Sequence, residues 1–475
     1  MTTASTHAAS AEVTPIDRQA RGPLLLLLVL GVLWLVPSGI FALLASVQLH
    51  SPQFLTDCAW LTHGRLEALQ ETAFLYGWAA NVGLAIALWV LARLGGYPLR
   101  ALNWTVAGAI FWNLGLVGGL VGIATGDMTT FSFFQLPRYV QPLMVLAYAA
   151  MAISGVLAWS GRRTDSTFAA HWYAVAALFL FPWMFLATEV VLIWLPVRGT
   201  VQAIAAGWYA QGVWTLWLAP LALAGCYYII PKVSGRVLSS YESAPLGFWC
   251  LLSVGAWTGG RHLIGGPVPA WIATMAVVTS ALMLFHYLVV ALNFRGVASA
   301  PGTGATFIRF GVSAYLLVGL LEVLTSFRAV ALHTQFTFIA TAQTQLGYYG
   351  AISMMFFGAV YYLVPRLAGR AWSSAGLVAG HRGLVMLGVV GSVAGLALAG
   401  FTQGAGLLQA TVSQGSIFEG MRLPLLLNTC AQATLLVANL LLVVNLIRTI
   451  ATCCTTVDAA AGLFRPAMNL EAPAL

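Results

Sequence analysis

Twelve apolar stretches, each long enough to cross a lipid bilayer, follow one another along most of the chain. A membrane-spanning helix needs about 20 consecutive apolar residues, whereas the strands of a membrane β-barrel are shorter and alternate in polarity. Only 7% of the residues are charged, against about 25% in a soluble domain. The sequence therefore predicts an all-α polytopic membrane protein with 12 transmembrane helices. The predicted helices lie at about 22–47, 72–94, 103–124, 138–160, 172–195, 207–230, 245–264, 270–294, 307–330, 340–363, 379–400 and 424–448.

The basic residues predict how the chain is oriented. If the N-terminus is cytoplasmic, 15 of the 21 Lys and Arg residues fall on the cytoplasmic side, which is the bias that membrane proteins show. We therefore expect both termini in the cytoplasm and the chain in a bacterial inner membrane. The same bias accounts for the net charge of +8, so the charge gives no reason to expect nucleic acid as a partner. The six basic residues on the other side are Arg65, Arg138, Arg198, Arg261, Arg328 and Arg422.

The chain is interpreted as one membrane domain over 22–448, between short cytoplasmic tails at 1–21 and 449–475. The first apolar stretch is longer than the core of a signal peptide and no convincing cleavage site follows it, so we expect a retained helix. The six cysteines show no CxxC spacing and are interpreted as small apolar or inert residues. No loop exceeds about 25 residues, so a cytochrome c domain or an ATPase would have to come from another chain.

Eight histidines are present, and none forms an HxH or HH pair. A membrane heme usually needs two axial imidazoles on facing helices, and a type-B copper needs about three. From the residues alone, each histidine is therefore interpreted as an interfacial or hydrogen-bonded structural residue.

Four segments resemble the catalytic subunit, subunit I, of the heme-copper oxidases. The cbb-type cytochrome c oxidases are the most similar branch, and nitric oxide reductase catalytic subunits share the same plan. The signatures include GRLEALQ in the second predicted helix, the YYIIPK end of the sixth and the YYLVPRL end of the tenth. The resemblance implies a twelve-helix bundle with the quasi-threefold arrangement of subunit I. The four segments are 62–78, 208–232, 240–271 and 342–367.

In this family histidines hold two b-type hemes, and the resemblance places glutamines at those positions. Gln70 and Gln345 stand where the low-spin heme has its two ligands, and Gln343 stands at the high-spin heme ligand. A glutamine amide offers iron only a weak, neutral oxygen. We therefore expect no heme, and we expect Gln70 and Gln345 to form a hydrogen bond across two helices instead.

The copper histidines are replaced in the same way. By the resemblance they fall at Gln211, Arg261 and His262, so one of three imidazoles remains, and the family's redox tyrosine falls at Gly255. Arg261 also places a fixed positive charge where a cationic metal would sit, which repels the metal. We expect no copper and no catalytic residue. The replaced histidine ligands are called the five matched positions below: Gln70, Gln211, Arg261, Gln343 and Gln345.

Bulky aromatic residues accompany these replacements. Tyr348 and Tyr349 follow the tenth-helix glutamines, and Trp214 and Trp217 lie close to Gln211. An unfilled void costs roughly 20–25 cal/mol per Å³, so these side chains are predicted to fill the space of the missing hemes. The alternative is that they are ordinary aromatic packing of a membrane protein.

Two acidic residues, Glu189 and Glu322, lie inside predicted helices. An intramembrane carboxylate is a functional candidate by default, and the resemblance places Glu322 where the family has a glutamate near its active site. The alternative is a structural acid, protonated or paired with an arginine. For Glu322 the expected partner in that case is Arg328.

These observations favour a non-catalytic role. We expect a cofactor-free homologue of cytochrome c oxidase subunit I that acts as a membrane subunit or assembly factor of a respiratory-type complex. Its expected partners are the lipid bilayer and a catalytic oxidase or cytochrome c subunit. Two alternatives stay open: an active terminal oxidase or nitric oxide reductase subunit with unusual ligands, and a transporter of protons or small molecules that uses Glu189, Glu322 and Arg261.

A relocated metal site is a further hypothesis. In the predicted topology four histidines lie toward the outer face, and two of them precede the second and tenth predicted helices. A zinc site would need ring nitrogens about 2.0–2.1 Å from the metal, so these rings would have to converge. The four residues are His50, His63, His262 and His333.

Overall fold

The computed structural model describes residues 14–295 and 300–454, and every regular element in those ranges is a helix. Eleven helices are long and apolar enough to cross a membrane, which confirms the all-α polytopic fold. They are α1 (Pro15–His50), α2 continuous with α3 (His63–Gly95), α4 (Leu102–Thr125), α5 (Gln141–Ser160), α6 with its π-helical end (Ala169–Trp194), α7 continuous with α8 (Thr200–Ser234), α10 (Ala270–Phe294), α11 (Thr303–Ser326), α13 continuous with α14 (Phe338–Ala368), α15 (Ala375–Leu407) and α16, whose apolar part is Gln414–Ala451.

The predicted helix at 245–264 is the one that is not continuous. It consists of α9 (Ala244–Val254) and a 3-10 helix, Gly255–Leu263. Three glycines fall in that second piece, and glycine weakens an α-helix. They also permit close packing, because a Cβ atom at Gly259 would lie 2.6 Å from the carbonyl oxygen of Gly207 in α7. Hydropathy alone predicts one helix here, since the break leaves the segment apolar.

The two end helices extend into the predicted tails. α1 begins at Pro15, because Thr14 caps it: the Thr14 hydroxyl accepts from the Asp17 backbone N–H at 3.4 Å, and the Asp17 carboxylate accepts from the Thr14 N–H at 3.0 Å. The buried Asp17 also accepts a hydrogen bond from the Trp89 indole at 2.9 Å. α16 runs on to Cys454. The rest of both predicted tails lies outside the described residues.

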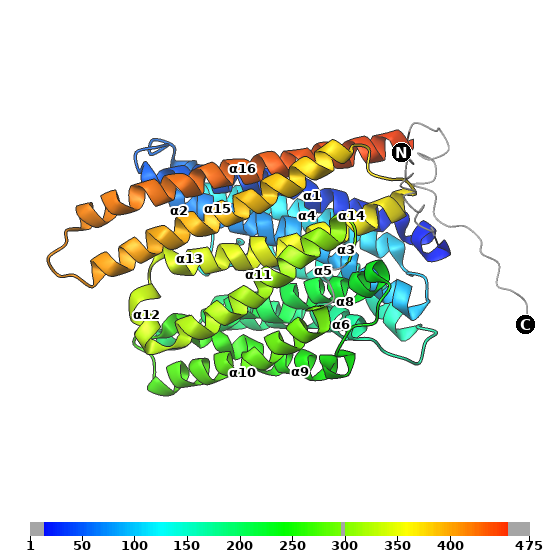
Figure 1. The fold of residues 1–475 in the computed structure, drawn as a ribbon, viewed down its shortest axis with the longest axis horizontal. Coiled ribbons are helices and arrows are strands. Elements are labelled where there is room, and N and C mark those ends of the chain that lie inside the picture. Colours follow the sequence, from blue (N-terminus) through cyan, green and yellow to red (C-terminus); the bar gives the residue numbers. More distant parts are fainter. Residues whose placement is uncertain (1–13, 296–299, 455–475) are drawn as a thin grey trace, which may run out of the picture.

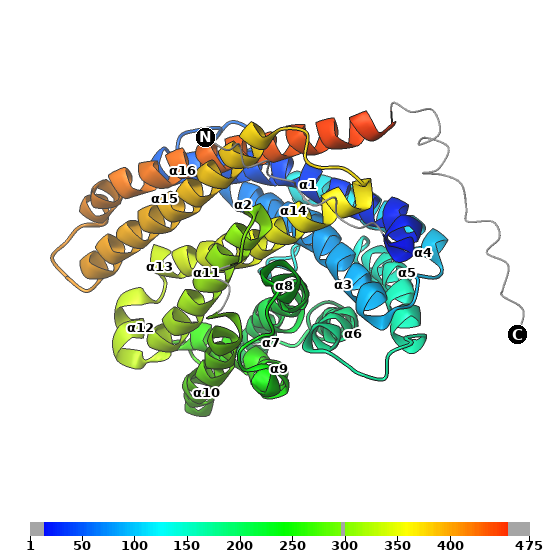
Figure 2. The same cartoon turned by 45° about the vertical axis from the view of Figure 1, so that its right-hand side comes forward.

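The helices run side by side along the long axis of the molecule (Figure 1, Figure 2). The first residues of α1 and the last residues of α16 lie at the same end, and the opposite end carries α12 (Arg328–Thr334) and the turn between α15 and α16 (Figure 1). We call that opposite end the α12 end. Because the chain enters and leaves the bundle at the same end, it must run along the bundle an even number of times. Within the described ranges, the continuous spanning helices number eleven. The segment formed by α9 and the 3-10 helix after it accounts for the remaining crossing.

Three central helices share a local distortion. Each changes from α-helix to π-helix in its middle, over Ala73–Ala79, Val213–Leu218 and Leu346–Ser353. These segments join α2 (His63–Thr72) to α3 (Ala80–Gly95), α7 (Thr200–Gly212) to α8 (Ala219–Ser234) and α13 (Phe338–Gln345) to α14 (Met354–Ala368). A π-helical segment inside an α-helix frequently marks a functional site.

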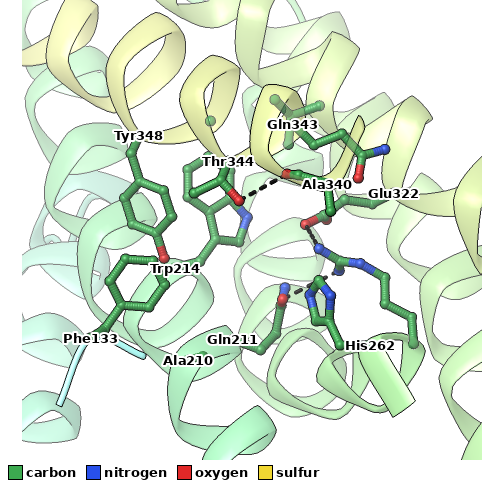
Figure 3. A pocket seen from close by; sticks show the side chains of 13 residues that line it. Phe133, Ala210, Gln211, Trp214, His262, Glu322, Ala340, Gln343, Thr344 and Tyr348 are labelled. Atoms are coloured by element: carbon green, nitrogen blue, oxygen red, sulfur yellow. Dashed lines mark hydrogen bonds and ion pairs between the residues drawn. The ribbon is translucent and has the colours of Figure 1, made fainter. Parts of the chain in front are cut away.

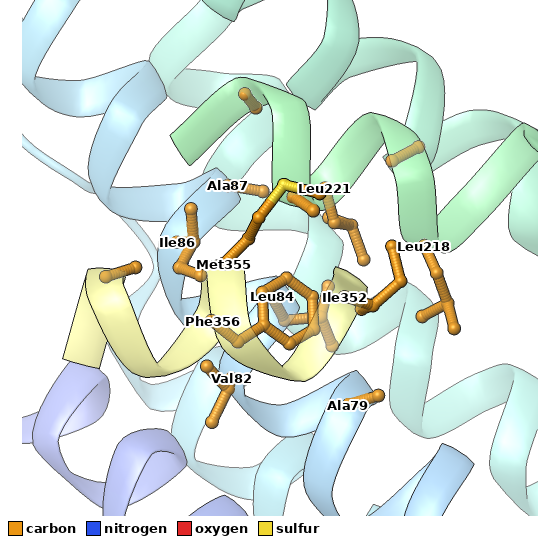
Figure 4. Packing of buried hydrophobic residues seen from close by; sticks show 14 of the residues in the cluster. Ala79, Val82, Leu84, Ile86, Ala87, Leu218, Leu221, Ile352, Met355 and Phe356 are labelled. Atoms are coloured by element: carbon orange, nitrogen blue, oxygen red, sulfur yellow. The ribbon is translucent and has the colours of Figure 1, made fainter. Parts of the chain in front are cut away.

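The core lies between these same three helices. The most apolar stretches of α2–α3 and α7–α8 are entirely buried, whereas those of most other helices are about half exposed, as expected for helices that face lipid. Figure 4 shows Val82 and Leu84 of α3, Leu221 of α8, and Met355 and Phe356 of α14 packed together without polar atoms. This dry layer occupies the middle of the bundle.

Candidate functional site

Four of the five matched positions lie where the central helices change from α to π geometry. Gln70 stands in the last turn of α2, Gln211 in the last turn of α7, and Gln343 and Gln345 in the last turn of α13. Arg261 comes from the 3-10 helix that follows α9. The fold therefore brings Gln211, Arg261 and Gln343 around one cavity and places Gln70 and Gln345 around another.

A buried ion pair includes Arg261, one of the matched positions. The Arg261 guanidinium Nη2 lies 2.8 Å from Oε1 of Glu322 in α11, and Arg261 Nη1 donates to Oε1 of Gln211 at 3.2 Å (Figure 3). The second carboxylate oxygen of Glu322 accepts a hydrogen bond from the Tyr287 hydroxyl at 3.1 Å. Arg261 and Glu322 are only 9% and 7% exposed. Because each charge is neutralised by the other, neither is left uncompensated in the interior.

The predicted partner of Glu322 was wrong. Arg328 is exposed in the first turn of α12, beyond the end of α11 at Ser326. The chain turns at Phe327, so Arg328 does not share a helix face with Glu322. The interpretation of Glu322 as an arginine-paired acid holds, with Arg261 as the arginine.

The cavity beside this ion pair is small and lined partly by aromatic rings (Figure 3). Its volume is about 60 Å³, well below the ~150 Å³ of an engineered cavity that binds benzene. The Trp214 ring lies 5.6 Å from both the Tyr348 and the Tyr315 rings, and Tyr348 lies 4.9 Å from Phe133. The Trp214, Tyr348 and Phe133 rings line this cavity. That Trp214 and Tyr348 fill the space of missing hemes stays a prediction. Trp217 points elsewhere and stacks on Phe181 at 3.8 Å.

Gln343 lines this cavity and also contacts α11. Its amide Nε2 donates to the Thr325 hydroxyl at 3.3 Å and to the Leu321 carbonyl at 3.4 Å. The amide thus joins α13 to α11.

Gln70 and Gln345 line a second cavity of about 20 Å³, together with Tyr349 and Asn439. The Tyr349 hydroxyl donates to Oδ1 of Asn439 at 2.7 Å, and its ring lies 5.9 Å from Phe74. Within the described ranges no hydrogen bond joins the two glutamines, so the predicted direct contact is not formed. The space between them is sufficient for about one water molecule.

These residues do not fit a heme or a copper ion. Amide oxygens are poor ligands for iron and copper, and the cavities of about 20 and 60 Å³ are far smaller than a porphyrin. Among the residues lining the larger cavity, His262 supplies the one imidazole, and Arg261, its neighbour in the sequence, lines the same cavity. A metal there would meet a neighbouring cation that already has its own carboxylate partner.

At Gly255, where the resemblance predicts the position of the family's redox tyrosine, neighbouring atoms already fill the space for a side chain. A Cβ atom at Gly255 would lie 2.9 Å from Cβ of Thr215, closer than real Cβ atoms approach. Thr215 belongs to the π-helical segment Val213–Leu218. The position therefore admits glycine and excludes an aromatic residue in this packing.

The relocated metal site finds no support in the described ranges. No three His, Cys, Asp or Glu side chains come together there. His63 lines a cavity near Gln48 and His262 lines the central one, while the His50 ring contacts the Ser51 hydroxyl at 3.0 Å. His333 is an exposed residue of α12.

Glu189, the other acidic candidate, is buried at the end of α6, directly before the π-helical segment Val190–Trp194. It does not line the cavity at Arg261 and Glu322. Among the described residues it forms no ion pair within 4.0 Å. The structure therefore separates Glu189 from Glu322.

Glu71, one residue after Gln70, is a further, partly buried acid that was not among the predicted candidates. Its Oε2 accepts a hydrogen bond from Nε2 of Gln135 at 2.5 Å, and Gln135 is buried in the loop between α4 and α5. Close by, the Tyr76 and Tyr209 hydroxyls lie 3.0 Å apart. Glu67 and Glu71 lie four residues apart, and Glu71 lies just before the apolar run that begins at Ala73. That position is a signal that could have identified this acid.

Comparisons with known proteins agree with this architecture. The family model described as cytochrome c and quinol oxidase polypeptide I matches residues 23–434. The chain is 22% identical over 395 residues to the cbb3-type cytochrome c oxidase subunit CcoN1 of Stutzerimonas stutzeri, an alignment that covers 79% of this chain and 82% of the relative. It is 24% identical over 408 residues to a cytochrome c oxidase subunit 1 homolog of Azorhizobium caulinodans, covering 79% and 71%.

A solved structure shows the same fold. A chain from the cryo-EM structure of a heme-copper terminal oxidase dimer superposes with a TM-score of 0.66, covering 95% of this chain and 85% of that one. The two sequences are 15% identical, so the likeness concerns the arrangement of the helices.

Proposed function

Since the chain belongs to the cytochrome c and quinol oxidase polypeptide I family, we propose that it is a cofactor-free member of that family. In this proposal it acts as a non-catalytic membrane subunit, or as an assembly factor, of a respiratory-type complex. It lies in a bacterial inner membrane with both ends in the cytoplasm, as the distribution of its basic residues indicates.

The observation that carries the proposal is the Arg261–Glu322 ion pair at 2.8 Å. A copper ion at this position would have to displace a guanidinium that is already neutralised by a carboxylate. Leaving either charge without its partner in the interior is strongly unfavourable. Arg261, at a position that the resemblance assigns to a copper ligand, thus holds two protein elements together, α11 and the 3-10 helix after α9.

The choice of partner rests on the relatives. They are named as subunits of cytochrome c oxidases, so a chain that keeps their fold keeps surfaces on which other subunits of such a complex can pack. We therefore propose a catalytic oxidase or a cytochrome c subunit as the partner. The bundle then contributes structure to the complex, and the redox chemistry occurs in another chain.

The proposal is tested by native electrophoresis of detergent-solubilised membranes that contain a tagged form of the chain. We expect the tag to migrate with a larger, heme-staining complex, and we expect deletion of the chain to lower oxygen consumption with reduced cytochrome c. The purified chain alone should consume neither oxygen nor nitric oxide. Turnover by the purified chain would instead support the rival function, an active oxidase or nitric oxide reductase.

A further inference from the structure

One hydrogen-bond donor at the central cavity has no acceptor. Nε2 of Gln211 makes no hydrogen bond with any described residue, whereas the Trp214 indole beside it has the Tyr287 side chain as its hydrogen-bonding neighbour. Gln211 and Trp214 are only 4% exposed, and both line the central cavity (Figure 3). Buried N–H groups in folded proteins nearly always have a partner. The Gln211 donor therefore points to a bound hydrogen-bond acceptor in the cavity.

The cavity continues toward the α12 end. A second cavity of about 20 Å³ adjoins it, and the two share Arg261, His262, Ala340 and Gln343 in their walls. Thr334 and Gln335, at the end of α12, line the second cavity. There the Gln335 amide donates to the His262 carbonyl at 2.7 Å, in an exposed position. The polar lining thus extends from the interior to a surface of the bundle.

The charge of the lining selects the ligand. Arg261 is already neutralised by Glu322 at 2.8 Å, so the site has a donor without a net charge. An ion of either sign would meet a like charge at short range in an interior of low dielectric constant. An uncharged molecule with oxygen lone pairs satisfies the Gln211 donor without that cost, and the larger cavity is wide enough for a water molecule.

We propose that the two cavities form one inlet from the α12 end that binds water, and uncharged hydrogen-bond acceptors of similar size, at Gln211 beside the Trp214 ring. The inlet ends at the Arg261–Glu322 ion pair. On the far side of Trp214 the side chains are closely packed: Trp217 is fully buried, stacks on Phe181 and lines neither cavity. This inference is independent of the proposed function, because it concerns solvent access and not the loss of cofactors.

Radiolytic footprinting of the full-length protein in nanodiscs tests the proposal. Hydroxyl radicals formed from water oxidise adjacent side chains, and mass spectrometry locates the oxidation. Trp217 is a matched internal control, since it is the same residue type one helical turn from Trp214. We expect oxidation of Trp214 to be at least several-fold faster than that of Trp217. Equal, slow oxidation of both residues would overturn the proposal.

The source of the oxygen separates an inlet from trapped water. If the protein is mixed briefly with ¹⁸O-labelled water before exposure, an open inlet delivers the heavy isotope to Trp214. Incorporation of the heavy isotope supports the proposal, and exclusive incorporation of the light isotope overturns it, because the water would then be sealed inside.

A blocking variant adds a structural control. Ala340 lies in the shared wall of both cavities, so Ala340→Phe should slow oxidation of Trp214 to the rate of Trp217. Thr341→Phe is the matched control, because Thr341 is an exposed neighbour in the same helix and lines neither cavity. It should leave the rate unchanged. Fast oxidation of Trp214 in the folded Ala340→Phe variant would contradict the proposed route, and the wild-type comparison decides the proposal if that variant does not fold.

Discussion

Arg261 and Glu322 form an ion pair at 2.8 Å in the interior of the bundle, between the 3-10 helix after α9 and α11. Such a pair adds little net stability when it replaces apolar packing, but it becomes very unfavourable when one partner is removed. Replacing only one residue of the pair should therefore lower the free energy of unfolding far more than replacing both.

Glu322→Gln should lower the free energy of unfolding by about 3–5 kcal/mol, because it leaves the Arg261 charge buried and unpaired. The double variant Arg261→Met with Glu322→Gln should recover most of that loss, since it removes the charge and keeps an acceptor for Tyr287. Thermal unfolding in detergent measures both.

The exposed pair Glu419–Arg422, at 3.9 Å, provides the control for this experiment. Glu419→Gln should change stability by at most about 0.5 kcal/mol, because water screens an exposed pair. If Glu322→Gln lowers the free energy of unfolding no more than Glu419→Gln does, the Arg261 charge does not need Glu322 as its partner, and the prediction is wrong.

Gly255→Ala should destabilise the protein by about 1–3 kcal/mol, the usual effect of overpacking. The new Cβ would lie 2.9 Å from Cβ of Thr215. Adding Thr215→Ala should not relieve this contact, whereas Thr215→Gly should, because the closest atom is Cβ itself. Gly64→Ala is the matched control, since nothing lies within 4 Å of a Cβ there. Chemical denaturation measures the free energy of unfolding of both variants. If Gly255→Ala is as stable as Gly64→Ala, the close packing at Gly255 is contradicted.

Restoring histidines at Gln70 and Gln345 should not restore heme binding. The two side chains face a cavity of about 20 Å³ that contains the Tyr349 ring, so ligands alone do not make room for a porphyrin. The double variant Gln70→His with Gln345→His, purified from heme-supplemented cells, should show no stoichiometric heme absorbance. A full complement of bis-histidine heme in that variant would mean that this region opens more easily than its packing indicates.

Hydropathy predicts most of the fold, because the length and polarity of a membrane-spanning helix are local properties of the sequence. The break at Gly255 escaped the prediction, since glycines in 255–263 change the helix geometry without lowering its apolar character. The partner of Glu322 also escaped, because the nearest arginine in the sequence is Arg328 and the nearest in space is Arg261. Contacts between distant segments of the chain leave no local pattern.

The resemblance to known oxidases located the matched positions, and the structure adds what surrounds them. The sequence could indicate that Gln70 and Gln345 face one region, but it could not give the size of the cavity between them. It also missed the hydrogen bond between Glu71 and Gln135, because Gln135 lies in a loop whose path depends on the packing of α4 and α5. Volumes and loop contacts follow from three-dimensional packing alone.

The central claim is that this chain holds neither heme nor copper, and the most direct measurement is the cofactor content of the purified protein. After co-purifying oxidases have been removed, a pyridine hemochrome assay and elemental analysis for copper and iron should both give amounts far below one per chain. A heme absorbance band near one equivalent per chain, retained through that purification, would contradict the account.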